Sequence, residues 1–246
     1  MKAASVSRLT TNRLSVYLRC LNLLDEAGIK NVSSRELADQ FHLNSAQIRK
    51  DLANFGEFGV RGVGYHVSDL KRHLINILGL SRQYSAVIVG AGNLGMALSG
   101  YRGFNTGGFR IVALFDASRE RVASLKRTGQ PAYPMSALKR VMKRESVDIA
   151  ILAVPAPSGQ IVLDQVAASG VRAVLNFVPV RLRVPEGVEL VTVDLKVQME
   201  SLAYHLTRTI AEPSGPAKRG RQRASAGPAR KARIRRPRAA TRTPRR

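Results

Sequence analysis

Residues Ser85-Ala-Val-Ile-Val-Gly90-Ala-Gly-Asn-Leu-Gly95 decide the fold of the larger part of this chain. The apolar run Ser85–Val89 is strand-sized, and the glycine-rich turn after it opens a helical pattern. Gly90 permits a tight turn and Gly95 permits close packing of the helix on the strand, whereas Gly92 lets another group approach the backbone. The stretch therefore predicts the first strand, turn and helix of an α/β domain.

The residues that follow continue the alternation of strand and helix. Strands are expected at Phe109–Phe115, Asp148–Val154, Arg172–Phe177 and Glu189–Val193, and helices near Ala137–Lys143, Gln160–Ala168 and Asp194–Ile210. Strands separated by helices form a mostly parallel sheet. Residues 84–193 are therefore predicted to be a Rossmann-type domain of the α/β class, followed by a single helix over residues 194–211.

Asp116 ends the second predicted strand, about 20 residues after the glycine turn, where a carboxylate can accept hydrogen bonds from an adenosine ribose. The helix N-terminus offers unpaired amides to a pyrophosphate. A 2′-phosphate would face the Asp116 charge, which favours NAD(H) over NADP(H), although Arg119 and Arg121 nearby weaken this preference. The predicted cofactor-binding residues are Gly90, Ala91, Gly92, Asn93, Leu94, Gly95 and Asp116, with Val154 and Pro155 at the end of a later strand.

A helix-turn-helix is predicted in the N-terminal third of the chain. Ser33 and Glu36 form a capping box for a helix over Ser34–Phe41. After a tight turn, Asn44 caps a further helix that runs to about Phe55. Two helices joined by so short a turn are typical of DNA-binding proteins.

A glycine-rich hairpin is expected directly after this motif, over Phe58–Val67. Ser68 is expected to cap a fourth helix that ends near Leu78. A hairpin that follows a helix-turn-helix forms a wing. Residues 1–80 are therefore predicted to be a winged-helix DNA-binding domain.

The helix after Asn44 presents a basic face that suits a DNA groove. Arg49 and Lys50 lie opposite its apolar face, and Arg or Lys bound to guanine is the commonest specific base contact. Arg61 at the wing tip suits a narrow minor groove. Asp51 is expected to be structural, because a carboxylate near phosphates is unfavourable. The predicted DNA-binding residues are Ser45, Gln47, Arg49, Lys50, Arg61 and Gly62.

The charge of the chain favours a polyanionic partner, nucleic acid first. The formal net charge is +23, and 13 of the 40 basic residues lie between Pro213 and Arg246, a stretch without a single acid. The remainder still carries +10. Residues 212–246 are predicted to be a disordered basic tail because they are rich in Pro, Gly, Ala and Arg and poor in apolar residues.

Three classes of protein are disfavoured by composition. No apolar run approaches the roughly 18 residues of a membrane span, and the N-terminus lacks the apolar region of a secretory signal. The single cysteine, Cys20, permits neither an internal disulfide nor a multi-thiolate metal site, and we expect it to be a buried thiol. A cytoplasmic location without membrane contact is the simplest expectation.

Enzymatic turnover is also disfavoured. The four histidines are His42, His66, His73 and His205, so none lies between residues 74 and 204, where a dehydrogenase would need an acid/base group. No tyrosine in that stretch has a lysine four residues later. The α/β domain is therefore predicted to bind a dinucleotide without turning it over.

Taken together, these residues resemble the redox-sensing transcriptional repressor family Rex over about residues 5–207. The resemblance rests on Ser45-Ala-Gln-Ile-Arg-Lys-Asp-Leu52, Phe55-Gly-Glu-Phe-Gly59, Arg61-Gly-Val-Gly-Tyr65, Gly90-Ala-Gly-Asn-Leu-Gly95, Asn176-Phe-Val-Pro179 and Ser201-Leu-Ala-Tyr204. It implies a homodimer that binds an inverted-repeat operator in double-stranded DNA, is released by NADH, and binds NAD+ in competition.

The resemblance also implies roles for single residues. Arg49, Lys50 and Arg61 match the family's DNA-reading positions, and Tyr101 lies near the nicotinamide end of its pocket. The C-terminal helix is exchanged between subunits, and Asp194 matches a position at the dimer interface. Leu195, also assigned to that interface, departs from the aromatic residue that some members carry next to the nicotinamide. The basic tail lies outside the family pattern.

Two other functions remain open from the residues alone. An NAD-dependent oxidoreductase with an accessory helical domain would still turn over a substrate after removal of Arg49 and Lys50. A non-specific, nucleoid-type DNA binder driven by its tail would lose all binding on deletion of residues 213–246. Under the repressor hypothesis the same deletion leaves operator preference intact and reduces only the salt dependence of binding.

Overall fold

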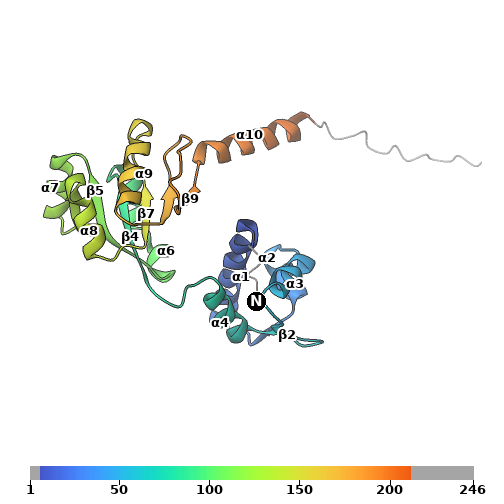
Figure 1. Cartoon of the computed structure of the whole chain (residues 1–246). Helices are drawn as coiled ribbons and strands as arrows, with labels where there is room; N and C mark the ends of the chain where they lie inside the picture. Colours follow the sequence, from blue (N-terminus) through green and yellow to red (C-terminus); the bar gives the residue numbers. More distant parts are fainter. Residues whose placement is uncertain (1–5, 212–246) are drawn as a thin grey trace, which may run out of the picture. The chain divides into compact units, whose positions relative to one another are not determined.

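The computed structural model of this chain describes residues 6–211 (Figure 1). These residues fall into two units that divide between Leu195 and Lys196. The basic tail predicted over residues 212–246 lies outside the described residues.

The N-terminal part is a winged helix. Its elements are α1 (Arg8–Glu26), β1 (Asn31–Val32), α2 (Ser34–Phe41), α3 (Ser45–Ala53), β2 (Gly59–Val60), β3 (Gly64–His66) and α4 (Val67–Ile77). The predicted capping box is present, since the Ser33 side chain accepts from the Glu36 amide and the Glu36 carboxylate accepts from the Ser33 amide. Asn44 caps α3 by accepting from the Gln47 amide. Both predicted helix starts are therefore confirmed.

The prediction that Ser68 caps the fourth helix was wrong. Helix α4 begins at Val67 and His66 occupies its N-cap position without a side-chain cap hydrogen bond. The chain enters the helix directly from the sheet, because His66 pairs with Asn31 and the Val67 amide donates to the Lys30 carbonyl at 2.8 Å. Val67 is buried at this junction, so the N-cap position lies two residues earlier than the capping signal suggests.

The wing belongs to a three-stranded antiparallel sheet in the order β1-β3-β2. The sequence predicted only the hairpin, and β1 was not expected because it is only two residues long. Gly64 has a φ of +93°, and a Cβ there would lie 2.6 Å from the Val32 carbonyl oxygen. Glycine at this position therefore lets β3 pair closely with β1, which anchors the wing.

Residues 84–192 form the predicted Rossmann-type sheet. Its strands are β4 (Tyr84–Val89), β5 (Phe109–Asp116), β6 (Ala132–Pro134), β7 (Ile149–Leu152), β8 (Ala173–Asn176) and β9 (Glu189–Thr192). They lie in the order β6-β5-β4-β7-β8-β9, and every neighbouring pair is parallel. The strand order reverses at β4, as in dinucleotide-binding folds.

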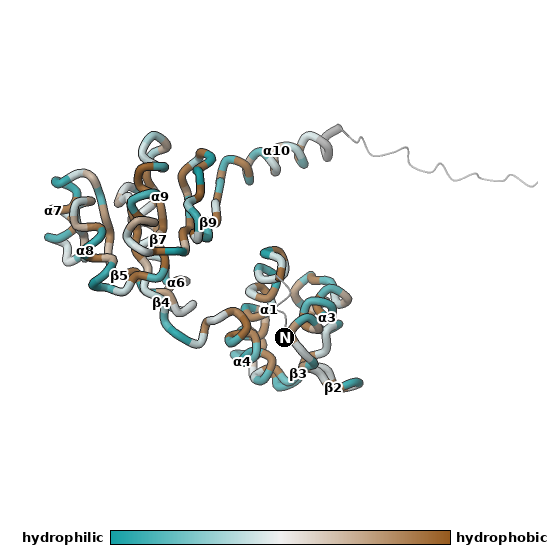
Figure 2. Tube along the Cα trace, in the orientation of Figure 1, coloured by the Kyte–Doolittle hydropathy of each residue, from teal (hydrophilic) through white to brown (hydrophobic). Residues whose placement is uncertain are grey.

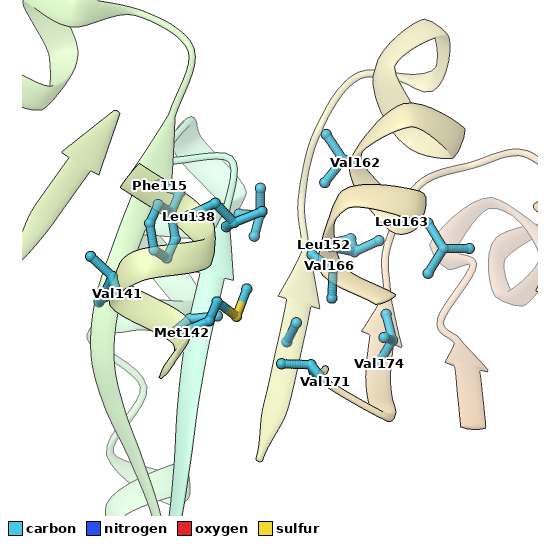
Figure 3. Packing of buried hydrophobic residues seen from close by; sticks show 14 of the residues in the cluster. Phe115, Leu138, Val141, Met142, Leu152, Val162, Leu163, Val166, Val171 and Val174 are labelled. Carbon is cyan, nitrogen blue, oxygen red and sulfur yellow. The ribbon is translucent and has the colours of Figure 1, made fainter. Parts of the chain in front are cut away.

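Helices cover both faces of this sheet. They are α5 (Asn93–Ser99), α6 (Arg102–Thr106), α7 (Arg119–Arg127), α8 (Leu138–Arg144) and α9 (Gly159–Ala168), with short 3-10 turns at Met135–Ala137 and Ala156–Ser158. Figure 3 shows Leu138, Val141 and Met142 of α8 beside Phe115, and Val162 and Val166 of α9 beside Leu152. A separate cluster joins Leu114 to Val122 of α7. The central strands are among the most hydrophobic segments (Figure 2).

The described chain ends in α10 (Leu195–Ala211). Several of its large apolar side chains are exposed, with Leu195 at 60%, Met199 at 66% and Leu206 at 63%. Within the described residues, no helix combines the length and the apolar character that crossing a membrane requires.

Candidate nucleotide cleft and DNA-reading surface

A cleft of about 690 Å³ lies at the carboxyl ends of the central strands. It is lined by Gly90 and Gly92 after β4, Asp116, Ala117 and Ser118 at the end of β5, Ala153, Val154 and Pro155 after β7, and Arg121, Met135, Ser158, Ile161, Val162 and Gln165. Strand β4 lies between β5 and β7, so the cleft opens at the point where the strand order reverses. Open α/β sheets bind their ligands at such points.

The three glycines of the turn have different roles. A Cβ on Gly90, whose φ is +102°, would lie 2.3 Å from the Ala153 carbonyl oxygen, and one on Gly95 would lie 1.9 Å from the Gly90 oxygen. These two residues close the turn and press α5 onto β4, as their positions predicted. A Cβ on Gly92 would meet no heavy atom within 4 Å. Gly92 therefore leaves open space beside the first amides of α5, which have no acceptor within the helix.

Asp116 is buried at the floor of the cleft and holds the turn in place. Its carboxylate accepts from the Ala91 amide at 2.9 Å, the Ser118 amide at 2.8 Å and the Arg121 guanidinium at 3.1 Å. Burial raises its pKa, but these three hydrogen bonds outweigh burial and hold the pKa below its usual value. A carboxylate has about four acceptor positions, so Asp116 keeps capacity for a ribose hydroxyl.

The other predicted cofactor residues divide into two groups. Val154 and Pro155 line the cleft beside Gly90, Gly92 and Asp116, whereas Ala91, Asn93, Leu94 and Gly95 belong to the adjoining turn and α5 without lining it. Tyr101 is not among the lining residues either. Its ring stacks edge-on with Phe104, 5.1 Å between centroids, and 58% of the residue is exposed.

The DNA-reading surface predicted from the sequence is formed by α3 and the wing. Arg49, Lys50 and Arg61 are exposed, and Ser45 is half-buried in the first turn of α3. Arg49 and Arg61 both line a hollow of about 520 Å³ between α3, the start of α2 and the wing. The Arg49 guanidinium donates to the Ser34 hydroxyl at 2.9 Å, so α2 steadies this side chain.

The wing tip is a tight turn. Val63 donates its amide to the Val60 carbonyl at 3.0 Å, which leaves Arg61 and Gly62 at the apex. Gly62 has a φ of +85° with no heavy atom near its Cβ position, so the backbone conformation rather than space requires glycine there. The tip is slim and carries one exposed cation, as the sequence predicted.

Asp51 is buried, as expected for a structural carboxylate, and it makes contacts that the sequence did not predict. Arg13 of α1 donates to both carboxylate oxygens, at 2.6 and 2.7 Å, and Tyr17 donates its hydroxyl at 2.9 Å. The Gln47 side-chain amide donates at 2.8 Å. The Arg13 hydrogen bonds are the largest influence on the pKa of Asp51 and hold it below its usual value despite burial.

Sequence reasoning missed three residues of these sites. Arg13 and Tyr17 lie 38 and 34 positions before Asp51, too far along the chain for a local pattern to connect them with it. Arg121 was noted only as a nearby cation, although it pairs directly with Asp116. The N-cap Ser118 places Arg121 in the first turn of α7, a helix that was not predicted.

The predicted dimer-interface residues lie at the junction of the two structural units. Asp194 precedes α10, and Leu195 is its first residue. Asp194 also lines a hollow of about 390 Å³ together with Val178, Leu182 and Leu190. The helix prediction, which began at Asp194, is therefore one residue early.

A basic recognition helix and wing, carried on the same chain as a dinucleotide-type cleft at a strand-order reversal, define a class of protein: a DNA-binding regulator with a nucleotide-responsive domain. Two family descriptions match the same division. Residues 5–53 match "Putative DNA-binding protein N-terminus" and residues 81–180 match "CoA binding domain".

The curated relatives are redox-sensing transcriptional repressors named Rex. The protein of Desulfitobacterium hafniense is 45% identical over 206 residues, covering 84% of this chain and 98% of its own. That of Pelotomaculum thermopropionicum is 47% identical over 208 residues, covering 85% and 97%. That of Streptomyces coelicolor is 41% identical over 211 residues, covering 86% and 81%. The chain belongs to the Rex family of redox-sensing transcriptional repressors.

Solved structures of a Rex-family repressor called RSP share this architecture. RSP in complex with β-NAD+ and operator DNA is 36% identical, with a TM-score of 0.78, and the match covers 84% of this chain and 94% of that one. RSP in complex with β-NADH is 34% identical, with a TM-score of 0.74, and the match covers 85% and 97%.

Proposed function

We propose that this protein is a redox-sensing transcriptional repressor that binds operator DNA as a homodimer and is released when NADH binds. The observation that carries the proposal is the cleft at the strand-order reversal, with Gly92 open to a pyrophosphate and Asp116 to a ribose. The same chain exposes Arg49, Lys50 and Arg61 on a winged helix. We assign DNA binding to a winged-helix domain over residues 1–80 and NADH sensing to a nucleotide domain over 84–193. A helix over 194–211 forms the dimer, and a basic tail over 212–246 follows it.

The DNA-binding residues follow from this assignment. Arg49 and Lys50 read base edges in the major groove, and Arg61 with Gly62 enters the minor groove. Ser45 and the first turn of α3 hold a phosphate. Gln47 belongs to the same surface, because its side-chain oxygen stays available as an acceptor while its amide nitrogen donates to Asp51.

The cleft offers a reason to prefer the reduced nucleotide. Met135, Val154, Pro155, Ile161 and Val162 give it an apolar wall, and its charged lining residues are Asp116 and Arg121, which pair with each other. NADH carries a neutral nicotinamide ring and NAD+ a positive one. Burying an unpaired charge is costly, so the apolar wall favours NADH while still admitting NAD+ in competition.

Release from DNA follows from the geometry that a dimer must satisfy. Two recognition helices bind two half-sites only when their spacing matches one turn of DNA or a multiple of it. We propose that α10 is exchanged between subunits, that Asp194 and Leu195 contribute to the interface, and that Tyr101 acts at the nicotinamide end. Closure around NADH then changes the spacing of the two α3 helices. The exposed apolar side chains of α10 support an intersubunit role.

We propose further that the protein is not an enzyme and acts in the cytoplasm. The relatives are named as repressors. Among residues 6–211, those that line the cleft include no histidine, lysine or tyrosine that would serve as an acid/base group for hydride transfer. An oxidoreductase would need such a group at the nicotinamide end.

Reciprocity of binding tests this scheme. If NADH weakens operator binding by some factor, operator DNA must weaken NADH binding by the same factor. We expect equal factors when NADH affinity is measured by its fluorescence with and without saturating operator duplex. An NADH affinity that operator DNA leaves unchanged would contradict the scheme, and a scrambled duplex is the matched control.

A further inference from the structure

Three side chains, together with Asp51, cross-link the recognition helix to α1. Arg13 and Tyr17 are one helical turn apart on α1, and Gln47 and Asp51 are one turn apart on α3. Together they give the Asp51 carboxylate four donors, two to each oxygen, at distances of 2.6 to 2.9 Å. Four donors fill its acceptor positions. Asp51 is 1% exposed, so the carboxylate at the centre of this network is both buried and saturated.

Apolar packing alone does not define where α3 lies on α1. Ile48 and Leu52 bury the inner face of α3 in the winged-helix core. Hydrophobic burial is non-directional, and it tolerates a small rotation or sliding of one helix on another. Hydrogen bonds of defined length and angle do not tolerate such movement. The polar network is therefore the part of this interface that specifies one arrangement.

A small error in that arrangement matters at the DNA surface. Side chains extend about 5–6 Å from a helix axis, so a rotation of roughly 15° moves their tips by about 1.4 Å, enough to break a base contact. Arg49 and Lys50 directly precede Asp51 on α3. Their position in a groove is thus tied to the same network that holds Asp51.

We propose that Asp51 is the positioning residue of the DNA-reading surface. Through Arg13 and Tyr17 it fixes the rotation of α3 and its shift along α1, and so sets where Arg49 and Lys50 meet base edges. The inference rests on the proposed operator binding. It also gives Gln47 a different role from the one predicted, because its side-chain amide completes the network from α3.

The network extends beyond the direct partners of Asp51, toward the N-terminal end of α1. The Arg13 guanidinium also donates to the Thr10 hydroxyl at 3.2 Å, and that hydroxyl lies 3.0 Å from the hydroxyl of Ser7, the N-cap residue of α1. The end of α1 and the recognition helix are therefore joined by one continuous chain of polar contacts. Arg13 is oriented from both sides.

The substitution Asp51→Asn tests positioning, with Asp39→Asn on the exposed face of α2 as the matched control. Binding to an operator duplex and to a scrambled duplex is measured by fluorescence anisotropy at several salt concentrations. We expect the operator-to-scrambled affinity ratio to fall about tenfold or more, the size of one lost bidentate base contact. Scrambled-duplex affinity and its salt slope should stay as in the wild type, because the phosphate-binding cations are unchanged.

A second variant keeps the test decisive if Asp51→Asn fails to fold. In Arg13→Met/Asp51→Leu, apolar volume replaces the ion pair, a change that often preserves stability. We expect a folded protein whose melting temperature is near the wild-type value and whose operator preference is still lost. A folded double variant that discriminates operator as well as the wild type does would overturn the proposal.

Gln47→Ala separates positioning from direct reading. A positioning role predicts weaker discrimination at every base pair that Arg49 and Lys50 read, measured with single base-pair substitutions in the operator. Loss of discrimination at one base pair alone would show that Gln47 reads that base pair and would contradict its positioning role. If the wild-type protein shows no operator preference, the proposed function is refuted. If the wild type prefers the operator and the variants prefer it equally, only the positioning role is refuted.

Discussion

Asp51 and Asp116 are buried carboxylates in the two halves of the chain, and they differ in what they leave available. Asp51 accepts four side-chain hydrogen bonds and is sealed inside the winged helix. Asp116 accepts three N–H donors, two of them backbone amides, and faces a cleft. A saturated carboxylate specifies the structure around it, whereas one with remaining acceptor capacity can also bind a ligand.

The difference explains which of the two the sequence revealed as functional. Asp116 follows a motif in which glycine turn, strand end and acid have fixed spacing, because the site is built from local elements. Two of the three partners of Asp51, Arg13 and Tyr17, come from a helix more than 30 positions away. Local patterns therefore marked Asp116 as a ligand-binding residue, and marked Asp51 only as an acid that does not suit a phosphate surface.

The largest expected effect is a loss of stability on substituting Gly95, which is tightly packed, compared with Gly92, which faces open space. In Gly95→Ala the new Cβ would lie 1.9 Å from the Gly90 carbonyl oxygen, so α5 must move off β4. We expect a loss of about 3 kcal/mol in the free energy of unfolding, at the upper end for overpacking. Denaturant unfolding followed by circular dichroism measures it.

Gly92→Ala is the matched control, since its Cβ meets no atom within 4 Å. We expect its unfolding free energy to stay within about 0.5 kcal/mol of wild type, while its NADH affinity falls because the methyl group occupies the space for the pyrophosphate. Equal destabilisation by the two substitutions would contradict the different roles assigned to these glycines.

Arg49→Ala tests whether the DNA-reading surface contacts base edges through Arg49. Loss of a bidentate base contact costs about 1–3 kcal/mol, or roughly 5- to 150-fold in operator affinity. Arg35→Ala, on an exposed arginine of α2, is the matched control. Anisotropy titrations with operator and scrambled duplexes measure both variants. If Arg49→Ala weakened the two duplexes equally, Arg49 would bind phosphate and would not read bases.

Asp116→Asn tests the ligand-binding half of the comparison. The variant loses the negative charge that opposes a 2′-phosphate, and its side-chain NH2 faces an N–H donor that the carboxylate accepts in the wild type. We therefore expect NADH affinity to fall about tenfold, the range of one charged hydrogen bond. The preference for NADH over NADPH should narrow. The control is Asp148→Asn; Asp148 directly precedes β7 and pairs with Arg82. Equal nucleotide affinities for the two variants would rule out a ribose contact by Asp116.

Acidification should reduce the contribution of both carboxylates to stability, and this effect should be smaller than those of the substitutions above. Their pKa values in the folded protein lie below the usual 3.8. Their contribution to stability is therefore fully present above that value and is lost as the pH falls through the folded-state pKa. Thermal melts between pH 6 and pH 3 should show a steeper loss in the wild type than in Arg13→Met/Asp51→Leu. Parallel curves would mean that the Asp51 network contributes no pH-dependent stability.

Much of the fold could be predicted because its signals are local. The capping box at Ser33, the Asn44 cap and the glycine turn after β4 each depend on residues within one or two turns of chain. Helix α7 escaped prediction because Val122 is its one buried residue, and a charged surface helix carries no apolar period. Strand β6, three residues at the sheet edge, gave no strand-length pattern.

The candidate sites divide in the same way. Gly90, Gly92 and Asp116 meet at one cleft as their spacing predicted. Tyr101, assigned by family resemblance, does not line that cleft in the single chain. The Arg13–Asp51 pair, the Arg121–Asp116 pair and the contact from Arg49 to Ser34 are tertiary contacts between elements whose packing no local pattern encodes.

The most direct test of the central claim is a titration of the purified protein on an inverted-repeat operator, with NADH and NAD+ added separately at fixed salt. The account predicts that NADH releases the protein from the operator at concentrations where NAD+ has little effect. Operator binding that neither nucleotide alters would contradict it, and would leave a winged-helix DNA-binding protein whose Rossmann domain responds to a different signal.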